Sequence, residues 1–131
     1  MAKNKSSYMD DQSWTDVRDG MRIDWDVPIP MDDGVVLRCD VYRPIKNGKY
    51  GVIMTLGPYG KFLHFNEIYA DQFDRMCEDF PEVPSESTNN YQNWEVVDPE
   101  KWVPDDYVCI RVDSRGAGRS PGMIDIWSGR E

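Results

Sequence analysis

Apolar and polar residues alternate strictly from Ile23 to Met31, and this period of two predicts a half-buried β-strand. Pro28 and Pro30 have no N–H to donate to a neighbouring strand, so they favour an edge position in the sheet. Asp32-Asp33-Gly34 follows as a strong hairpin signal, and a second strand is expected from Val35 to Tyr42. The pattern therefore predicts an antiparallel hairpin at the start of the sheet.

A helical segment separates the next two expected strands. Gly51 to Leu56 is apolar without alternation, which is typical of a strand covered on both faces, hence of a sheet with helices on each side. From Phe65 to Phe80 the apolar residues lie three and four positions apart and predict an amphipathic helix. A polar excursion occupies residues 81 to 99, Pro99 to Trp102 opens a short helix, and Tyr107 to Asp113 is the last strand. A strand, a helix and a strand in this order predict a crossover between parallel neighbours.

This order of elements predicts an α/β fold, with an antiparallel hairpin leading into a mostly parallel sheet with flanking helices, as in the front half of an α/β-hydrolase fold. Residues 1 to 20 are polar with little periodicity, and we expect them to form a flexible amino-terminal arm with Trp14 pinned onto the body. Residues 21 to 131 are expected to form the hydrolase-like domain.

The charge of the chain narrows the class of partner. The 131 residues carry a formal net charge of −9, and because phosphate binding needs a basic face, we expect neither nucleic acid nor an anionic membrane surface as a partner. No run approaches the roughly 20 apolar residues of a membrane span. The first residues carry positive charge with no apolar segment behind it, unlike a secretory signal. We therefore expect a cytoplasmic protein.

The cysteines Cys39, Cys77 and Cys109 are too few and too scattered for a disulfide framework or a metal site. Cys39 and Cys109 lie within expected strands and are interpreted as buried thiols. No cluster of His, Cys and carboxylate residues supports zinc. A GxGxxG nucleotide fingerprint fails because position 121 is proline. We expect no metal and no cofactor.

Tyr59 is the candidate for chemistry that the strand pattern singles out. Gly57-Pro58 and Gly60 mark a sharp turn leaving the third strand, so Tyr59 is expected at the carboxyl end of a strand, where open α/β sheets place their ligands. A phenol there can donate one hydrogen bond into a cleft. It is interpreted either as an oxyanion donor or as a turn residue packed on the following helix with its hydroxyl in water. Lys61 and Phe62 orient the loop or touch substrate, and the sequence does not decide between these roles.

The segment Gly118 to Gly122 matches the G-x-S-x-G pattern of a nucleophile elbow, with Ser120 at its centre. An elbow needs a strand running directly into the serine, whereas six residues separate Asp113 from Ser120. The N–H after the serine helps to hold the oxyanion, yet Pro121 has none. We interpret the turn as a cleft floor fixed by hydrogen bonds of Asp113 and Arg115. The carboxylates between residues 95 and 106 are interpreted as a solvated face.

Three motifs together resemble one family: Asp33 to Pro44, Gly57 to Lys61, and the pair of Asp106 to Val108 with Asp113 to Gly122. In this order they are similar to the amino-terminal part of the Xaa-Pro dipeptidyl-peptidase-like serine hydrolases, which include cocaine esterase and the α-amino-acid ester hydrolases. The match runs from about Ile23 to Trp127. The resemblance implies a serine, histidine and aspartate triad and a tyrosine in the oxyanion hole, and Tyr59 is the counterpart of that tyrosine.

The resemblance also implies what this chain does not carry. The nucleophile elbow would be expected beyond Glu131, with the aspartate and the histidine further downstream, so the one histidine, His64, is interpreted as a loop residue near the cleft mouth. The chain is therefore expected to be the amino-terminal portion of a serine hydrolase acting on ester or amide bonds, including Xaa-Pro peptide bonds. The alternative is a catalytically inactive fragment or a binding module that reuses the scaffold.

The absent strand of such a hydrolase would leave Val52 to Leu56 at an open edge of the sheet. A flat apolar edge invites pairing with another chain. We therefore expect the chain to be poorly soluble, to dimerise through that edge, or to require a polypeptide carrying the carboxyl-terminal half. The expected substrate is a small ester, an amide or a peptide.

Overall fold

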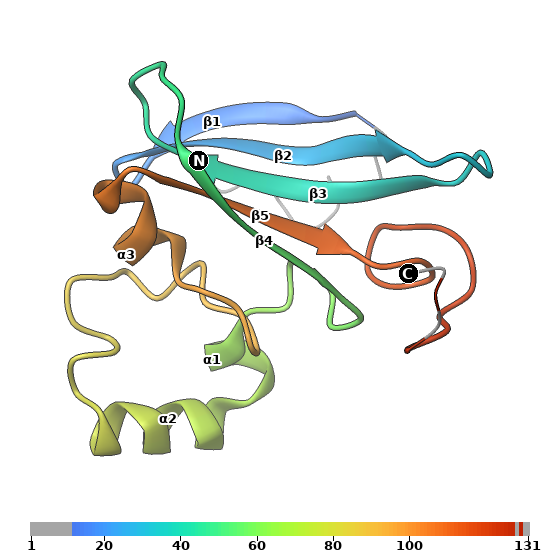
Figure 1. Ribbon diagram of the computed structural model, residues 1–131. Helices are drawn as coiled ribbons and strands as arrows, with labels where there is room; N and C mark the ends of the chain where they lie inside the picture. Colours follow the sequence, from blue (N-terminus) through green and yellow to red (C-terminus); the bar gives the residue numbers. More distant parts are fainter. Residues whose placement is uncertain (1–11, 128, 130–131) are drawn as a thin grey trace.

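A computed structural model of the chain describes residues 12–127 and 129. These residues form one five-stranded sheet in the order β1-β2-β3-β5-β4 (Figure 1). The strands are β1 (Trp14–Arg18), β2 (Met21–Pro30), β3 (Val36–Arg43), β4 (Gly51–Gly57) and β5 (Tyr107–Asp113). The helices are α1 (Phe65–Ile68), α2 (Ala70–Asp79), α3 (Pro99–Trp102) and the 3₁₀ turn η2 (Val103–Asp105).

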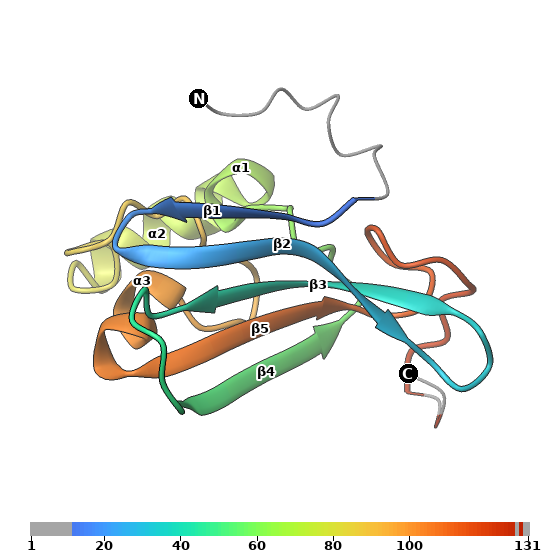
Figure 2. The ribbon, with the colours of Figure 1, turned by 90° about the horizontal axis from the view of Figure 1, so that it is seen from above.

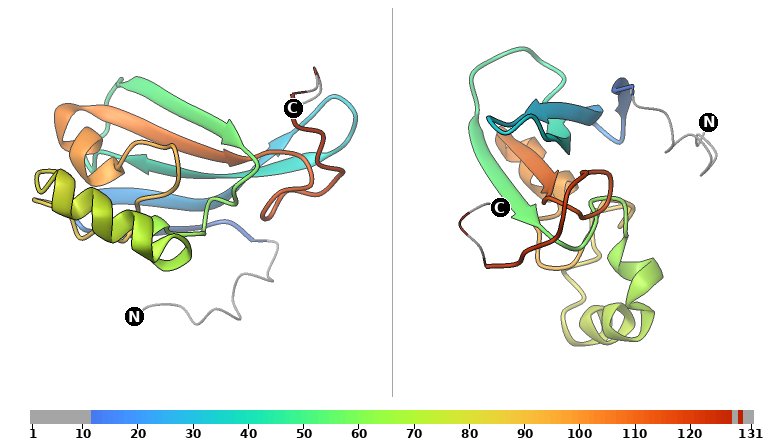
Figure 3. Two further views of the ribbon diagram at one scale, coloured as in Figure 1. Left: turned by 90° about the horizontal axis from the view of Figure 1, so that it is seen from below. Right: turned by 90° about the vertical axis from the view of Figure 1, so that its right-hand side faces the viewer.

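The sheet confirms the predicted α/β class, and its pairing is mixed. β4 and β5 are parallel and are joined through α1, α2 and α3, as the crossover prediction requires. The pairs β1–β2, β2–β3 and β3–β5 are antiparallel, so the described residues hold one parallel pair rather than a mostly parallel sheet. The helices lie on one side of the sheet (Figures 2 and 3).

The predicted hairpin between β2 and β3 is confirmed. Pro30 and Val36 are register partners, and the turn is closed by a hydrogen bond of 2.8 Å from the N–H of Met31 to the carbonyl of Val35. Gly34 has a φ of +84°, a conformation that glycine adopts without strain. The turn signal in the sequence therefore sets the register of the first two predicted strands.

The expected flexible arm is wrong for residues 14 to 18, which form β1 and pair with Met21 to Trp25. Trp14 and Trp25 stack with their ring centroids 6.1 Å apart, so the expected pinning of Trp14 is seen. β2 therefore has neighbours on both sides along its first half, and the edge position predicted from its prolines applies to its second half in the described residues. Residues 1 to 11 of the expected arm lie outside the described residues.

The core has one cluster on each face of the sheet, because successive side chains of a strand point to opposite faces. Ile23, Tyr42 and Cys109 belong to one cluster, and Leu37 and Cys39 to the other. The predicted burial of Cys39 and Cys109 is confirmed.

The apolar positions of β4 and of the helical segment are less covered than expected. The predicted helix is present, but it breaks at Tyr69, and neither α1 nor α2 has a buried residue. On β4 the side chains of Val52, Met54 and Leu56 are 57%, 63% and 41% exposed. The expectation of cover on both faces is therefore wrong for the described chain. The predicted open edge is confirmed, since β4 ends the strand order.

Candidate active site

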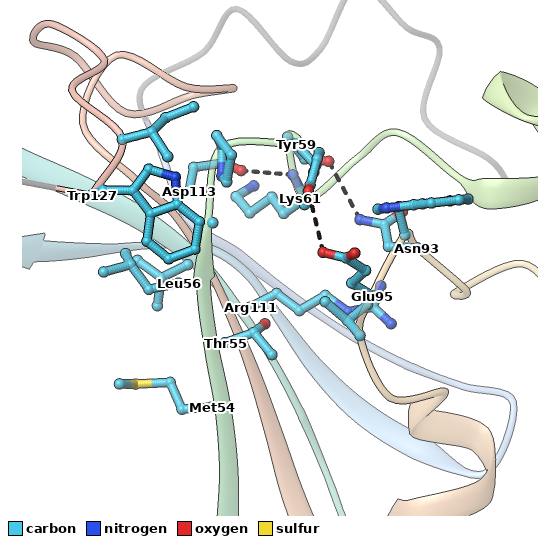
Figure 4. Close-up of a pocket in the computed structure, with 17 residues that line it drawn as sticks. Met54, Thr55, Leu56, Tyr59, Lys61, Asn93, Glu95, Arg111, Asp113 and Trp127 are labelled. Atoms are coloured by element: carbon cyan, nitrogen blue, oxygen red, sulfur yellow. Dashed lines mark hydrogen bonds between the residues drawn. The ribbon is translucent and has the colours of Figure 1, made fainter.

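A cleft of about 470 Å³ lies at the carboxyl ends of the two parallel strands. β4 ends at Gly57 and β5 at Asp113, and these two residues are register partners. Both lie in the lining, together with residues of the loop after β4, the excursion before α3 and the segment near Trp127 (Figure 4). This is where α/β sheets bind ligands.

Tyr59 lies on the loop after β4 and lines the cleft (Figure 4). Its side chain is 44% exposed, and its hydroxyl donates a hydrogen bond of 3.1 Å to Oε2 of Glu95. That hydrogen bond raises the pKa of Tyr59 above its ordinary value, because the carboxylate favours the protonated phenol. The hydroxyl therefore has a carboxylate acceptor rather than water alone, and its catalytic role stays a prediction.

Glu95 reaches the cleft from the polar excursion that precedes α3. Its backbone has a φ of +57°, an uncommon conformation for a residue with a side chain. The neighbouring Trp94 packs against α1 and its end, with ring centroids 5.1 Å from Phe65 and 4.8 Å from Tyr69. The carboxylates between residues 95 and 106 are expected to form a solvated face. Glu95 is exposed, in agreement with that expectation, but it also accepts a hydrogen bond from Tyr59.

The Tyr59 loop is fastened on both sides of the tyrosine. The N–H of Ser114 donates to the carbonyl of Gly57 at 3.0 Å, and Nδ2 of Asn93 donates to the carbonyl of Gly60 at 3.3 Å. Gly60 has a φ of +80°, which a residue with a side chain adopts only with strain. The loop therefore presents Tyr59 from a fixed backbone.

Lys61 is buried, with 4% of its side chain exposed. Its ammonium lies 3.0 Å from Oδ1 of Asp40 and 3.2 Å from Oδ1 of Asp26. Asp26 has a φ of +55° at a register shift in β2, which turns its carboxylate inward. Lys61 lines the cleft, but its ammonium is paired with these two carboxylates, and this geometry fits the loop-orienting one of the two roles that the sequence left open.

Asp113 clamps the glycine-rich turn after β5 onto the Tyr59 loop. Its Oδ1 accepts from the N–H of Lys61 at 2.6 Å, and its Oδ2 from the N–H of Arg119 at 2.8 Å. Arg115 pairs through Nη1 with Oδ2 of Asp33 in the hairpin turn at 2.8 Å. The predicted fixing of this turn by Asp113 and Arg115 is confirmed.

Burial shifts the pKa of the two carboxyl groups of this cluster, Asp40 and Asp113, in the same direction. It raises the pKa of Asp40, against the lowering effect of Lys61, and it raises the pKa of Asp113, against the hydrogen bonds from Arg119 and Lys61. For Lys61, burial lowers the pKa, but the carboxylates of Asp40 and Asp26 outweigh it and the pKa is raised. Lys61 is therefore a cation at neutral pH.

Ser120 is buried and its hydroxyl is committed to the backbone. Its Oγ donates to the carbonyl of Asp113 at 2.6 Å and accepts from the N–H of Arg38 at 2.9 Å. This geometry supports the interpretation of Ser120 as a structural residue. His64 is a loop residue that precedes α1 as its N-cap and does not itself line the cleft.

The sequence missed Glu95 and the two aspartates that pair with Lys61. In the alternating pattern of β2, Asp26 counts as an outward polar position, and the shift in register that turns it inward has no sequence signal. Asp40 is likewise a polar position in a strand. Among the described residues, no three His, Cys, Asp or Glu side chains group closely enough to hold a metal ion, and no helix is long and apolar enough to cross a membrane.

Two solved structures that share this fold are of hydrolases of one family. A CocE/NonD family hydrolase from Staphylococcus aureus superposes with a TM-score of 0.67 and 33% identity, over 85% of this chain and 18% of that one. A second structure of a CocE/NonD family hydrolase from this organism gives a TM-score of 0.65 and 32% identity over the same shares. No curated protein sequence matches the chain.

The sheet order and the cleft at its parallel strands define the class: the chain corresponds to the amino-terminal part of a CocE/NonD-type hydrolase with an α/β fold. The sequence pattern of the X-Pro dipeptidyl-peptidase (S15) family matches residues 33–131, and the chain belongs to this family. It spans about 18% of the length of the S. aureus hydrolases. The resemblance drawn from the three sequence motifs is thereby confirmed.

Proposed function

We propose that this chain is the amino-terminal portion of a serine hydrolase that cleaves ester or amide bonds, among them Xaa-Pro peptide bonds, by acyl transfer to water. The observation that carries the proposal is the Tyr59 hydroxyl, which lies in the cleft beyond the carboxyl end of β4. Membership of the family supports the class of reaction. In this proposal Tyr59 supplies one donor of the oxyanion hole.

The reaction would begin when a serine hydroxyl attacks the substrate carbonyl and a histidine accepts the serine's proton. The carbonyl oxygen then becomes an oxyanion, which Tyr59 and the backbone N–H after the serine stabilise. We place the serine, the histidine and the aspartate in polypeptide outside residues 1–131. In this proposal the chain therefore contributes one hydrogen bond to the reaction, and Tyr59 donates it in the transition state.

Glu95 sets a condition on this role. A phenol has one proton to donate, and in the structure that proton is directed at Glu95. The substrate carbonyl must therefore replace Glu95 as the acceptor. A carboxylate beside a developing oxyanion is repulsive, and because Glu95 is exposed, its side chain can turn into solvent when substrate enters.

The position of the nucleophile is tested with a fluorophosphonate reagent, which reacts with activated serines. We expect the isolated chain to stay unlabelled and to leave p-nitrophenyl acetate intact. Addition of the polypeptide that carries the nucleophile elbow should give both labelling and hydrolysis. Labelling of Ser120 in the isolated chain would contradict the proposal. A completed protein that folds without hydrolysing esters or amides would favour the alternative, an inactive binding module.

A further inference from the structure

Lys61 joins segments that are distant in the sequence, at a point two residues beyond Tyr59. Its ammonium pairs with Asp40 on β3 and with Asp26 at the β2 bulge, while its backbone N–H is held by Asp113 at the end of β5. Arg119, from the turn after β5, completes the cluster through an ion pair of 2.8 Å with Oδ2 of Asp26.

Burying these charged groups contributes little net free energy to the stability of the loop. Moving charges out of water costs more free energy than burying apolar groups of the same size, so a buried ion pair is weak evidence of a stabilising role. What it supplies is geometry, because buried charges tolerate only positions in which they stay paired. Lys61 can meet both Asp26 and Asp40 only if the loop is seated on the sheet.

The position of Lys61 on the sheet determines where Tyr59 lies. A single residue, Gly60, separates Tyr59 from Lys61, and its carbonyl is held by Asn93. The helices that follow contribute no buried residue, so they offer the loop little support. The ammonium of Lys61 is a buried side-chain anchor on the loop itself, two residues from Tyr59.

We propose that Lys61 is a positioning residue, whose ion pairs with Asp26 and Asp40 hold the Tyr59 hydroxyl where it can reach a substrate carbonyl. The inference rests on the proposed function of Tyr59. It predicts that loss of the ion pairs impairs turnover even in a variant that keeps the stability of the protein.

The obvious variant, Lys61→Met, is a poor test because it leaves the three carboxylates of Asp26, Asp40 and Asp113 facing Arg119 as the cation of the cluster. The double variant Lys61→Met/Asp40→Asn removes one charge of each sign. Oδ1 of the new amide can still accept from the N–H of Asp26, as Asp40 does at 2.8 Å. This variant removes the ion pairs of Lys61 but keeps the net charge of the cluster, so its effect reports on the position of the loop. Lys61→Arg, which keeps the cation, is the conservative variant.

The first measurement is amide hydrogen exchange of the isolated chain. In the double variant we expect the amides of residues 61 to 63 to exchange at least about tenfold faster, while those of residues 109 to 112 in β5 change little, since local opening need not follow global stability. Equal acceleration of both groups, or no acceleration of residues 61 to 63, would overturn the proposal.

The second measurement is turnover of the hydrolytically active protein that contains this chain. The double variant should lower kcat about 10–100-fold with KM within about threefold, because a displacement of about 1 Å can cost that much. Lys61→Arg should recover most of the loss. A kcat within about twofold of wild type in the double variant would overturn the proposal. If Tyr59→Phe also left kcat unchanged, the proposed function would fail, and the exchange measurement would still decide whether Lys61 holds the loop.

Discussion

Tyr42 is fully buried in the core, and its hydroxyl has no hydrogen-bond partner among the described residues. Its ring is packed edge-on against Trp25 and Tyr91 and lies under the guanidinium of Arg111, 5.1 Å from the ring centroid. These contacts belong to the ring and not to the hydroxyl. Burial raises the pKa of Tyr42 above its ordinary value.

Tyr42→Phe should therefore keep or increase stability, by up to about 1 kcal/mol at pH 7, because an unsatisfied buried hydroxyl is removed. It should also make the protein less sensitive to alkali. Above pH of about 10 the unfolded tyrosine loses its proton while the folded one keeps it, so wild-type stability falls as pH rises. Urea unfolding at pH 7 measures the change in stability. Urea unfolding at a pH of about 10.5, above the ordinary pKa of tyrosine, measures the sensitivity to alkali.

Tyr91→Phe is the matched control, since the hydroxyl of Tyr91 donates to the carboxylate of Asp19. Loss of that hydrogen bond should cost about 1 kcal/mol. A cost above about 1 kcal/mol for Tyr42→Phe would show that its hydroxyl is satisfied after all.

At the scale of elements, the turn after β5 depends on close approach between backbone and carboxylate. A Cβ added at Gly118 would lie 2.2 Å from Oδ2 of Asp113, and Gly118 has a φ of +50°. Asp113 holds both this turn and the Tyr59 loop. A side chain at position 118 would therefore disturb two loops that line or support the cleft.

Gly118→Ala should destabilise the protein by about 2–4 kcal/mol, through backbone strain and displacement of a buried carboxylate. Gly34→Ala is the control, because Gly34 also has a positive φ, of +84°, but nothing lies within 4 Å of an added Cβ. It should cost about 1 kcal/mol. Thermal and denaturant unfolding measure the two values, and equal costs would show that the approach to Asp113 is unimportant.

At the scale of the whole molecule, β4 is an edge strand with a row of exposed apolar side chains: Val52, Met54 and Leu56. Met54 and Leu56 line the candidate active-site cleft, together with Ile126 and Trp127. An edge of this kind offers unpaired backbone groups and an apolar face to another chain. We propose that β4 pairs with the polypeptide that completes the hydrolase or, in its absence, with a second copy of this chain.

Sedimentation velocity over a range of concentrations tests this pairing. The isolated chain should self-associate, and Met54→Lys should weaken the association because a charge on an edge strand opposes pairing. Val17→Lys, at an equally exposed position (63% for both) on the opposite edge strand, is the control and should have little effect. A compact monomer at all concentrations would contradict the prediction.

The parts of the fold that sequence could predict are those with local causes. The alternation from Ile23, the turn at Gly34 and the apolar run from Gly51 each act within a few residues, and the strands follow them. β1 was missed because Trp14–Arg18 is mostly polar and becomes a strand through pairing with β2.

The candidate site divides in the same way. Tyr59 was predictable because a turn at the end of a strand marks it. Glu95 and Asp26 were not predictable, for two reasons. Each has a positive backbone φ, which directs its side chain, and each contacts a residue that lies far away in the sequence. Hydrogen bonds and ion pairs between such distant residues depend on the tertiary fold, which the spacing of residues does not encode.

The role of Tyr59 is tested by the turnover number of Tyr59→Phe in the hydrolytically active protein that contains this chain. Tyr50→Phe is the control, since its hydroxyl bonds the carbonyl of Lys46 and it lies outside the cleft lining. We expect Tyr59→Phe to lower kcat by about 10²–10³ with unchanged thermal stability, as loss of an oxyanion donor does, and Tyr50→Phe to leave kcat unchanged. A kcat for Tyr59→Phe within a few-fold of wild type would contradict this expectation.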